Sequence, residues 1–259
     1  LTSLNLNGIR SATSKGLEQW ISRVRPDCMG VQEVKAQATD VRERFEQLAG
    51  LTGYFHFAEK KGYSGVGVYT RHEPSDIIHG FDPEEFDSEG RCLELRFDSP
   101  GRRFSIFSIY FPSGSSGPQR QEAKYRFLDR VFPFLQQHRA AREFVICSDV
   151  NIAHQAIDLR NWRSNQKNSG FLPEERAWMG KLLGSGLVDV YRHLEPDATD
   201  ACYTWWSNRG QAWAKNVGWR LDYQLATPAI AQAARRVHIE KGERFSDHAP
   251  LTVDYDWAL

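Results

Sequence analysis

The chain has 259 residues, of which 41% are hydrophobic and 25% are charged, a composition typical of a folded globular protein. Its apolar runs are too short to cross a bilayer, so we expect no membrane partner. The 33 basic and 33 acidic residues cancel, whereas a strong nucleic-acid binder usually carries net positive charge. Overall charge therefore argues against such a partner, although acidic metal ligands would mask local basic clusters.

The cysteine pattern and the lack of internal divisions bound the class of protein. The sequence contains Cys28, Cys92, Cys147 and Cys202, widely spaced and without a CxxC pair. We interpret them as reduced core residues, which predicts a cytoplasmic protein. No repeat, low-complexity segment or linker interrupts the sequence. We therefore expect one domain over residues 1–259.

The first third of the chain alternates strands and helices. Residues 2–8 alternate polar and apolar types and predict a short strand that ends in a turn. Residues 17–24 carry apolar side chains at helical spacing, which predicts an amphipathic helix, and Pro26 ends it. Residues 28–31 predict a buried strand. Residues 41–48 predict a helix with a glycine after its end, and residues 66–69 predict a strand.

The remaining sequence is richer in strands than in helices. The strands are expected at residues 92–97, 104–111, 144–147, 221–226, 237–239 and 248–257. The helices are expected at residues 127–135, where Pro133 must kink or shorten the helix, and at residues 173–183. Residues 154–172 show no period and predict a long loop of the kind that is usually functional. This scattering of helices among strands predicts an α/β protein with two sheets packed face to face and helices outside.

Polar residues of one kind follow at least five predicted strands. They are Asn5 and Asn7, Glu33, Tyr110, Asp149 and Asn151, and Asp247 and His248, with Asp222 added. One such strand end is common, because an Asx turn often ends a strand. Each residue also has a simpler interpretation, such as a solvated carboxylate for Glu33 or a turn cap for His248. Five such ends in one domain favour a single pocket at one edge of the sheets.

The residue types in this set indicate a particular chemistry. Carboxylates and amides without a thiolate are ligands that suit Mg²⁺ or Mn²⁺ and not zinc. A histidine beside a carboxylate can stabilise charge on a phosphoryl oxygen, and a separate aspartate can take a proton from water. Metal-assisted hydrolysis of a phosphodiester is the reaction that fits this set.

Eight motifs make the chain resemble the exonuclease III family of DNA-repair nucleases, within the endonuclease/exonuclease/phosphatase superfamily. They occupy residues 5–10, 32–35, 62–66, 110–114, 148–153, 168–171, 219–223 and 246–250. They follow the family's order and cover essentially the whole chain. The resemblance implies a four-layer α/β sandwich, DNase I-like, in which helices flank two packed mixed β-sheets.

The resemblance also implies roles for individual residues. The implied metal ligands are Asn5, Glu33, Asp149, Asn151, Asp247 and His248, with Glu33 as the main one. The implied catalytic residues are Tyr110, Asp149, Asn151, Asp222 and His248. Asp149 would activate water, and His248, oriented by Asp222, would stabilise negative charge. The implied substrate-binding residues are Asn7, Asn165, Asn168, Trp205, Trp219 and Leu221.

The function implied by the resemblance is DNA repair by a cytoplasmic, monomeric enzyme that uses Mg²⁺ or Mn²⁺. It would act as a 3′-5′ exodeoxyribonuclease and 3′-phosphodiesterase on double-stranded DNA, and cleavage at abasic sites stays open. One alternative is a non-catalytic RNA-binding regulator resembling catabolite repression control protein, which would not need the full set of site residues. Another is a superfamily phosphatase that acts on a small molecule.

Four positions depart from the family pattern, namely Leu4, Ser113, Ser148 and His154. Ser113 and His154 border the expected phosphate site, so they bear on substrate preference. We expect an imidazole at position 154 to narrow the groove and favour strand ends. DNA contacts are expected at local basic positions, namely Lys60, Lys61, Arg120, Lys124, Arg160, Arg163, Lys167 and Lys215.

Overall fold

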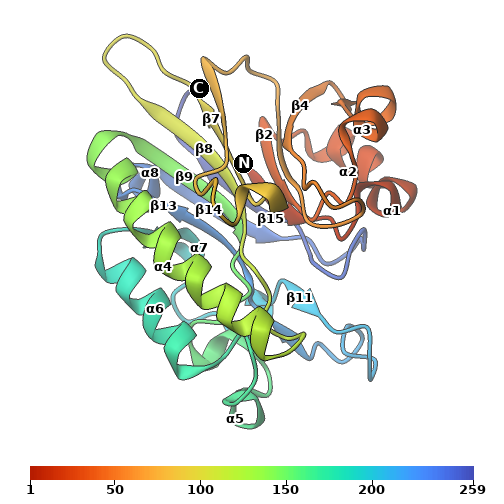
Figure 1. The fold of residues 1–259 in the computed structure, drawn as a ribbon. Helices are drawn as coiled ribbons and strands as arrows, with labels where there is room; N and C mark the ends of the chain where they lie inside the picture. Colours follow the sequence, from red (N-terminus) through yellow and green to blue (C-terminus); the bar gives the residue numbers. More distant parts are fainter.

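A computed structural model describes residues 1–259, except for the side chain of Glu43. Two β-sheets pack face to face, and helices cover their outer faces (Figure 1). This arrangement confirms the predicted four-layer α/β sandwich with two mixed sheets. No helix in the part of the chain that the structure describes has an apolar stretch long enough to cross a membrane.

The first sheet has seven strands in the order β14-β15-β1-β2-β5-β4-β3. In that order the strands are Ala234–Ile239, Leu251–Tyr255, Thr2–Asn5, Cys28–Gln32, Val66–Thr70, Leu51–His56 and Gln47–Leu48. The central strands β1 and β2 are parallel, with Asn5 beside Gln32, and the other pairs are antiparallel. The carboxyl ends of β1 and β2 therefore lie at the same edge of the sheet.

The second sheet has six strands in the order β10-β13-β9-β8-β7-β6. In that order the strands are Val188–Asp189, Asp222–Ala226, Glu143–Asp149, Phe104–Tyr110, Cys92–Arg96 and Asp76–His79. The strands β8 and β9 are parallel, and Tyr110 lies beside Asp149. A separate two-stranded sheet pairs β11, Trp205–Trp206, with β12, Gly218–Trp219.

The helices divide between the two outer faces (Figure 1). Helices α1 (Ile9–Ser14), α2 (Leu17–Val24) and α3 (Ala38–Arg44) pack on the first sheet. Helices α4 (Pro118–Ala141) and α6 (Pro173–Gly184) pack on the second. Short helices complete the fold, namely α5 (Trp162–Asn165), α7 (Val190–Leu194), α8 (Pro228–Ala233), η1 (Asp87–Glu89), η2 (Ala156–Asp158) and η3 (Asp200–Cys202).

The interface between the sheets is apolar and tightly packed. Val68 of the first sheet and Leu95 and Ile106 of the second belong to one buried cluster. A Cβ added at Gly30 of β2 would lie only 2.4 Å from the Cys147 Cβ of β9. Because real Cβ atoms do not approach so closely, only glycine allows β2 and β9 to pack here. This contact brings the ends of both strands together.

Three local predictions were partly wrong. The helix expected at residues 41–48 ends at Arg44, because β3 begins at Gln47 and pairs with β4. The helix expected at residues 127–135 is not shortened and runs from Pro118 to Ala141. Pro133 has no backbone N–H, so the carbonyl of Asp129 loses its hydrogen-bond donor within the helix. Both residues are exposed, so water can donate to that carbonyl instead. The loop expected at residues 154–172 contains the short helices η2 and α5.

Candidate active site

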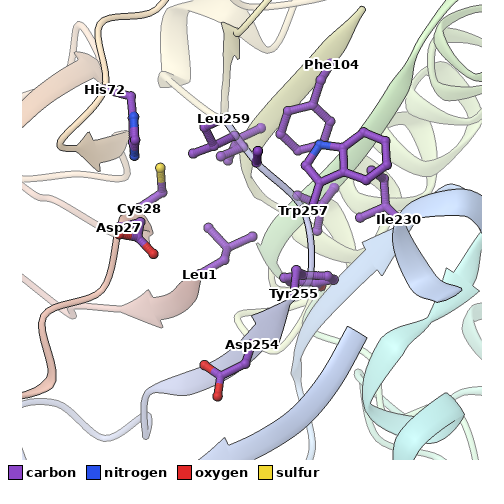
Figure 2. Close-up of a pocket in the computed structure, with 13 residues that line it drawn as sticks. Leu1, Asp27, Cys28, His72, Phe104, Ile230, Asp254, Tyr255, Trp257 and Leu259 are labelled. Carbon is purple, nitrogen blue, oxygen red and sulfur yellow. The ribbon is translucent and has the colours of Figure 1, made fainter. Parts of the chain in front are cut away.

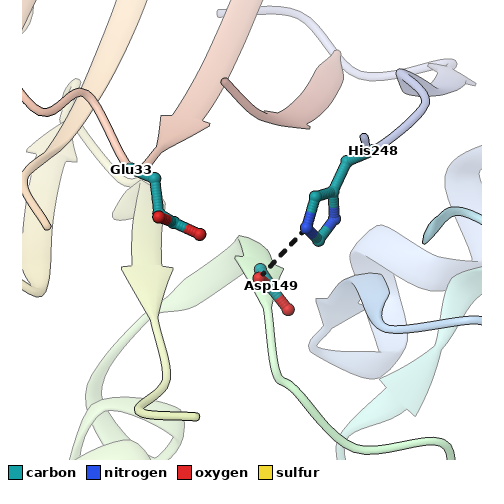
Figure 3. Close-up of side chains that lie close together, drawn as sticks. All are labelled: Glu33, Asp149 and His248. Atoms are coloured by element: carbon teal, nitrogen blue, oxygen red, sulfur yellow. Dashed lines mark ion pairs between the residues drawn. The ribbon is translucent and has the colours of Figure 1, made fainter. Parts of the chain in front are cut away.

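The side chains of Glu33, Asp149 and His248 meet where the two sheets end (Figure 3). Each offers one metal-ligating atom, and these atoms lie within 4.8 Å of one another. Glu33 follows β2, Asp149 ends β9, and His248 precedes β15. The parallel pairs β1–β2 and β8–β9 place their carboxyl ends together, which is why residues so distant in sequence converge.

Asn5 links the two carboxylates across the sheets. Its Nδ2 donates to Glu33 Oε1 at 2.9 Å and to Asp149 Oδ2 at 2.8 Å. The Asn5 Oδ1 accepts from the backbone N–H of Asn7 at 2.9 Å, which fixes the orientation of the amide. Asn5 itself is buried. One neutral donor therefore holds two like charges close together.

Glu33 adopts an unusual backbone conformation, with φ of 49°. A non-glycine residue in this left-handed region is strained by roughly 1–3 kcal/mol, and such strain gathers at functional sites. Lys35 Nζ lies 2.7 Å from Glu33 Oε2 and 2.5 Å from Asn7 Oδ1. Burial opposes the charged form of Glu33, but Lys35 and Asn5 outweigh it and lower the pKa of the carboxyl. Glu33 is thus ionised at neutral pH.

Asp149 is almost completely buried beside Asn151. Its Oδ1 accepts from the backbone N–H of Asn151 at 2.9 Å. The Asn151 amide nitrogen donates to the Phe111 carbonyl at 3.0 Å, so its oxygen is turned away from that carbonyl. Burial raises the pKa of Asp149, since it removes the carboxylate from water, while His248 opposes the shift. A carboxylate with a raised pKa is a stronger base.

His248 lies between two carboxylates. Its Nδ1 is 2.8 Å from Asp222 Oδ2, and its Nε2 is 3.7 Å from Asp149 Oδ2. Burial disfavours the imidazolium, but Asp222 and Asp149 outweigh it and raise the pKa of His248 to about 10. An imidazolium has no free nitrogen lone pair. When protonated, His248 can therefore stabilise negative charge, and it could ligate a metal ion only after losing a proton.

Asp247 and Tyr110 complete the cluster. Asp247 accepts from Asn7 Nδ2 at 3.0 Å and from Trp205 Nε1 at 3.1 Å. Burial raises the pKa of Tyr110 well above its usual range, and the charges of Glu33 and Asp149 add to the shift. Tyr110 is therefore a neutral phenol that can donate a hydrogen bond.

The cluster lies at the base of a cleft of about 720 Å³. Asn168, Trp205, Trp219 and Leu221 line this cleft together with the catalytic candidates. The rings of Trp205 and Trp219 meet edge to face, with centroids 6.3 Å apart. The cleft therefore has a polar floor and an aromatic wall.

Two predicted substrate-binding positions, Asn165 and Asn7, lie outside this cleft. Asn165 is not among the described residues that line this cleft. Its side chain donates a hydrogen bond to the Asn161 carbonyl and accepts one from the Asn168 amide. Asn7 lines a neighbouring cavity of about 310 Å³ with Lys15 and Arg244, on the other side of Asp247.

The position of His154 contradicts the expectation that its ring narrows the phosphate groove. A Cβ added at Gly180 of α6 would lie 3.7 Å from His154 Nε2, so the ring packs toward that helix. Ser113, in contrast, does line the cleft.

One predicted basic contact is wrong, and two others pair with acidic residues at partly exposed positions. Lys124 is completely buried and pairs with Glu175, so it is inaccessible to DNA. Arg120 contacts Glu89, and Arg160 contacts Asp200. Lys167 lines the cleft, and so does Arg209, an exposed residue that lies outside the predicted motifs.

A second cavity, of about 400 Å³, lies at the ends of β2 and β9 that are opposite the active cluster (Figure 2). Cys28 of β2 and Val145 of β9 line it near the beginnings of the strands whose far ends carry Glu33 and Asp149. Phe104 and Trp257 contribute apolar surface (Figure 2). Asp27, His72 and Asp254 also line it, so the cavity mixes apolar and polar side chains and lacks the clustered carboxylates of the cleft.

The oxygen donors of the cluster fit a hard divalent cation. Glu33 and Asp149 present buried carboxylate oxygens to the same small volume, and Asp247 lies alongside. Oxygen ligands at this density suit Mg²⁺ or Mn²⁺. The cluster can therefore bind a metal ion, as the sequence predicts.

The fold and the cluster define a phosphodiester hydrolase of the DNase I-like class. The chain belongs to the Endonuclease/Exonuclease/phosphatase family, which it matches over residues 2–248. It is 32% identical to an exodeoxyribonuclease of Bacillus subtilis over 254 residues, which cover 98% of each chain. It is 31% identical to exodeoxyribonuclease III of Haemophilus influenzae over 270 residues, with 98% of each chain covered.

Solved structures agree with these relatives. A 3′ phosphatase from Neisseria bound to a product DNA hairpin has a TM-score of 0.88 and 25% identity, covering 99% of this chain and 98% of that one. An AP endonuclease from Archaeoglobus fulgidus has a TM-score of 0.85 and 26% identity over 99% and 98% of the two chains. The comparisons confirm the predicted family resemblance and the predicted class, a DNA-repair nuclease.

Proposed function

We propose that this protein is a Mg²⁺-dependent nuclease that hydrolyses phosphodiester bonds at the 3′ ends of double-stranded DNA. The observation that carries the proposal is the convergence of Glu33, Asp149 and His248 within 4.8 Å at the base of an open cleft. A carboxylate pair beside a charged imidazole suits a reaction that generates negative charge on a phosphoryl oxygen. The relatives named exodeoxyribonucleases support DNA as the substrate.

We assign Glu33 as the main metal ligand, supported by Asn5, Asp149, Asn151 and Asp247. Glu33 suits this role because its lowered pKa keeps it ionised. When bound, Mg²⁺ would neutralise charge on the phosphate and polarise its oxygens. The Lys35 ammonium lies 2.7 Å from Glu33 Oε2, so this oxygen already has a cation beside it.

The catalytic steps fall to residues of the second sheet and to His248. Asp149 takes a proton from the attacking water, since its raised pKa makes it a better base than an ordinary aspartate. The Asn151 amide and the Tyr110 phenol bond the phosphate. His248, oriented by Asp222 at 2.8 Å, stabilises the negative charge that develops on the phosphoryl oxygen.

The cleft wall would receive the end of the DNA strand. Trp205, Trp219 and Leu221 offer apolar surface for a sugar or base, and Asn168 offers an amide to a phosphate. We place Asn7 and Asn165 one step further out, where they orient Asp247 and Asn168. The same wall fits a flipped-out abasic sugar, so we include cleavage at abasic sites among the reactions to be tested.

We also propose that residues 1–259 form one domain and act as a monomer in the cytoplasm. Both sheets contribute to the active cluster, so neither would be functional alone. The four cysteines are free and buried, which suits a reducing compartment.

A test of the proposed function compares four substrates with purified protein and Mg²⁺. These are a 3′-recessed duplex, a duplex with a 3′-phosphate, a duplex with an internal abasic site, and single-stranded RNA. We expect release of 3′ nucleotides or 3′-phosphate that stops when the metal is chelated. Binding of RNA without hydrolysis of any DNA substrate would instead support a non-catalytic regulator.

A further inference from the structure

A buried ion pair lies beneath the cleft loops. The side chains of Lys124 of α4 and Glu175 of α6 are both 0% exposed, and Lys124 Nζ is 2.6 Å from Glu175 Oε1. A buried ion pair is weak evidence for stability, because desolvation offsets much of the attraction. Neither Lys124 nor Glu175 is among the described residues that line the cleft. The pair is therefore out of contact with solvent and with any substrate bound in the cleft. Its contacts with the cleft loops are more informative.

Lys124 acts on the loop that carries the catalytic candidates. Its Nζ donates to the backbone carbonyl of Asn151 at 2.8 Å. Asn151 has φ of 55°, and its backbone N–H holds Asp149 Oδ1 at 2.9 Å. The ammonium therefore holds the carbonyl of a residue in the left-handed region that directly orients Asp149. Loss of this bond would let Asn151 relax and move the carboxylate that it holds.

Glu175 acts on a second loop. Its Oε2 accepts from the backbone N–H groups of Gly170 at 2.6 Å and Leu172 at 3.0 Å. Ser169 Oγ lies 3.4 Å from Oε1. Ser169 and Gly170 both line the cleft, next to Asn168. Glu175 thus fixes the backbone that presents the phosphate-binding amide of Asn168.

A third loop joins the same network through Gln121. Gln121 Nε2 donates to Glu175 Oε1 at 3.0 Å. A Cβ added at Gly114 would lie 1.9 Å from Gln121 Oε1 and 2.6 Å from Ser169 Oγ, so the three groups pack without space between them. Gly114 also lines the cleft.

We propose that Lys124 and Glu175 are positioning residues that set the geometry of Asp149, Asn151 and Asn168 for hydrolysis. This inference rests on the proposed nuclease function and adds two residues that touch neither metal nor substrate. Small displacements of reacting groups lower the turnover rate strongly and affect substrate binding less. The pair should therefore influence kcat more than KM.

The test uses Lys124→Met, Glu175→Gln and the double variant, assayed on a 3′-recessed duplex with Mg²⁺ well below each variant's Tm. We expect kcat to fall roughly 10- to 100-fold, while KM changes less than about threefold. The double variant should be no slower than the slower single variant, because both substitutions break one unit. Hydrogen exchange should rise in peptides that cover residues 150–153 and 167–172.

A matched control removes another buried charge at the opposite end of α4, the helix that carries Lys124. Arg142 caps α4 at its far end, has a side chain that is 6% exposed, and contacts Glu94 and Asp98. Arg142→Met should lower Tm comparably but keep kcat within about twofold, because it lies away from the cleft loops. If Lys124→Met does not fold, the Glu175→Gln variant carries the same test.

The outcomes separate the two levels of the proposal. An active wild type whose Lys124 and Glu175 variants keep kcat within about twofold would overturn the positioning role alone. A control that loses as much kcat as the Lys124 variant would overturn it as well, since the effect would then follow stability. A wild type without hydrolysis would overturn both the positioning role and the proposed function.

Discussion

Asn5 and Asp149 lie 144 residues apart in the sequence, and the Asn5 amide nitrogen donates a hydrogen bond of 2.8 Å to the Asp149 carboxylate. Asn5 ends β1 of the first sheet, and Asp149 ends β9 of the second. The same nitrogen donates to Glu33 at 2.9 Å. This single amide therefore couples the spacing of the two carboxylates to the packing of the two sheets.

Replacing Asn5 with alanine should separate these carboxylates. Without the shared donor, nothing bridges the two carboxylates and their repulsion is less well offset, so we expect kcat to fall roughly 10- to 100-fold and the required Mg²⁺ concentration to rise. Steady-state rates over a Mg²⁺ titration measure both quantities. Gln136→Ala, which removes an amide on α4 that bonds Ser185, is the control and should leave them unchanged.

The charge of Glu33 should govern metal affinity. Glu33→Gln keeps the size of the side chain but removes its charge, so the midpoint of the Mg²⁺ titration should move to higher concentration. High Mg²⁺ should partly restore the rate. Glu59→Gln, at an exposed position, should behave as wild type. An unchanged midpoint for Glu33→Gln would show that Glu33 does not hold the metal.

Binding to DNA should depend on a few cations at the cleft. Lys167 and Arg209 line it, and each neutralised phosphate contributes roughly −0.9 to the slope of log affinity against log salt concentration. Lys167→Ala and Arg209→Ala should each make the slope shallower by about 1. Fluorescence anisotropy with a duplex at several salt concentrations measures the slope. Slopes that match the wild type would exclude these residues as phosphate contacts.

Acid stability should depend on Asp158. Burial opposes ionisation of this carboxyl, but Arg220 and Arg192 outweigh it and lower its pKa to about 2. Because the folded-state pKa is below the unfolded value near 3.9, the contribution of Asp158 is present above about pH 4 and lost toward pH 2. It amounts to about 2 kcal/mol.

Asp158→Asn is the matching variant. Its free energy of unfolding should be lower than that of the wild type at neutral pH and should change less between pH 4 and pH 2. Chemical denaturation at several pH values measures the difference. Asp197→Asn, at an exposed position, should follow the wild-type curve. Parallel curves for wild type and Asp158→Asn would contradict the assignment.

Much of the fold and the cluster could be predicted from the sequence. Runs such as residues 144–147 are apolar and β-branched, and the polar residues that follow mark strand ends. The carboxyl ends of neighbouring parallel strands lie at the same edge of a sheet. Pairing of these strands therefore brings the polar residues that follow them together at that edge. Strand β6 gave no such signal, because it is an exposed edge strand with no apolar alternation.

Side-chain environments were less predictable. Lys124 on a helix has the pattern of a solvated cation, and its partner Glu175 lies 51 residues away. Only the packing of α4 against α6 creates the buried pair. The orientation of His154 depends likewise on the space beside Gly180. Such contacts arise from tertiary packing, which local sequence patterns do not encode.

The most direct test of the central claim compares wild type with Asp149→Asn on a 3′-recessed duplex. Single-turnover hydrolysis at saturating Mg²⁺ should fall by roughly 10²- to 10⁴-fold, the usual contribution of a positioned general base. Duplex affinity, measured in parallel, should hold or rise, because the variant removes a negative charge that faces the phosphodiester. A wild type inactive with both Mg²⁺ and Mn²⁺, or an Asp149→Asn variant as fast as the wild type, would contradict the account.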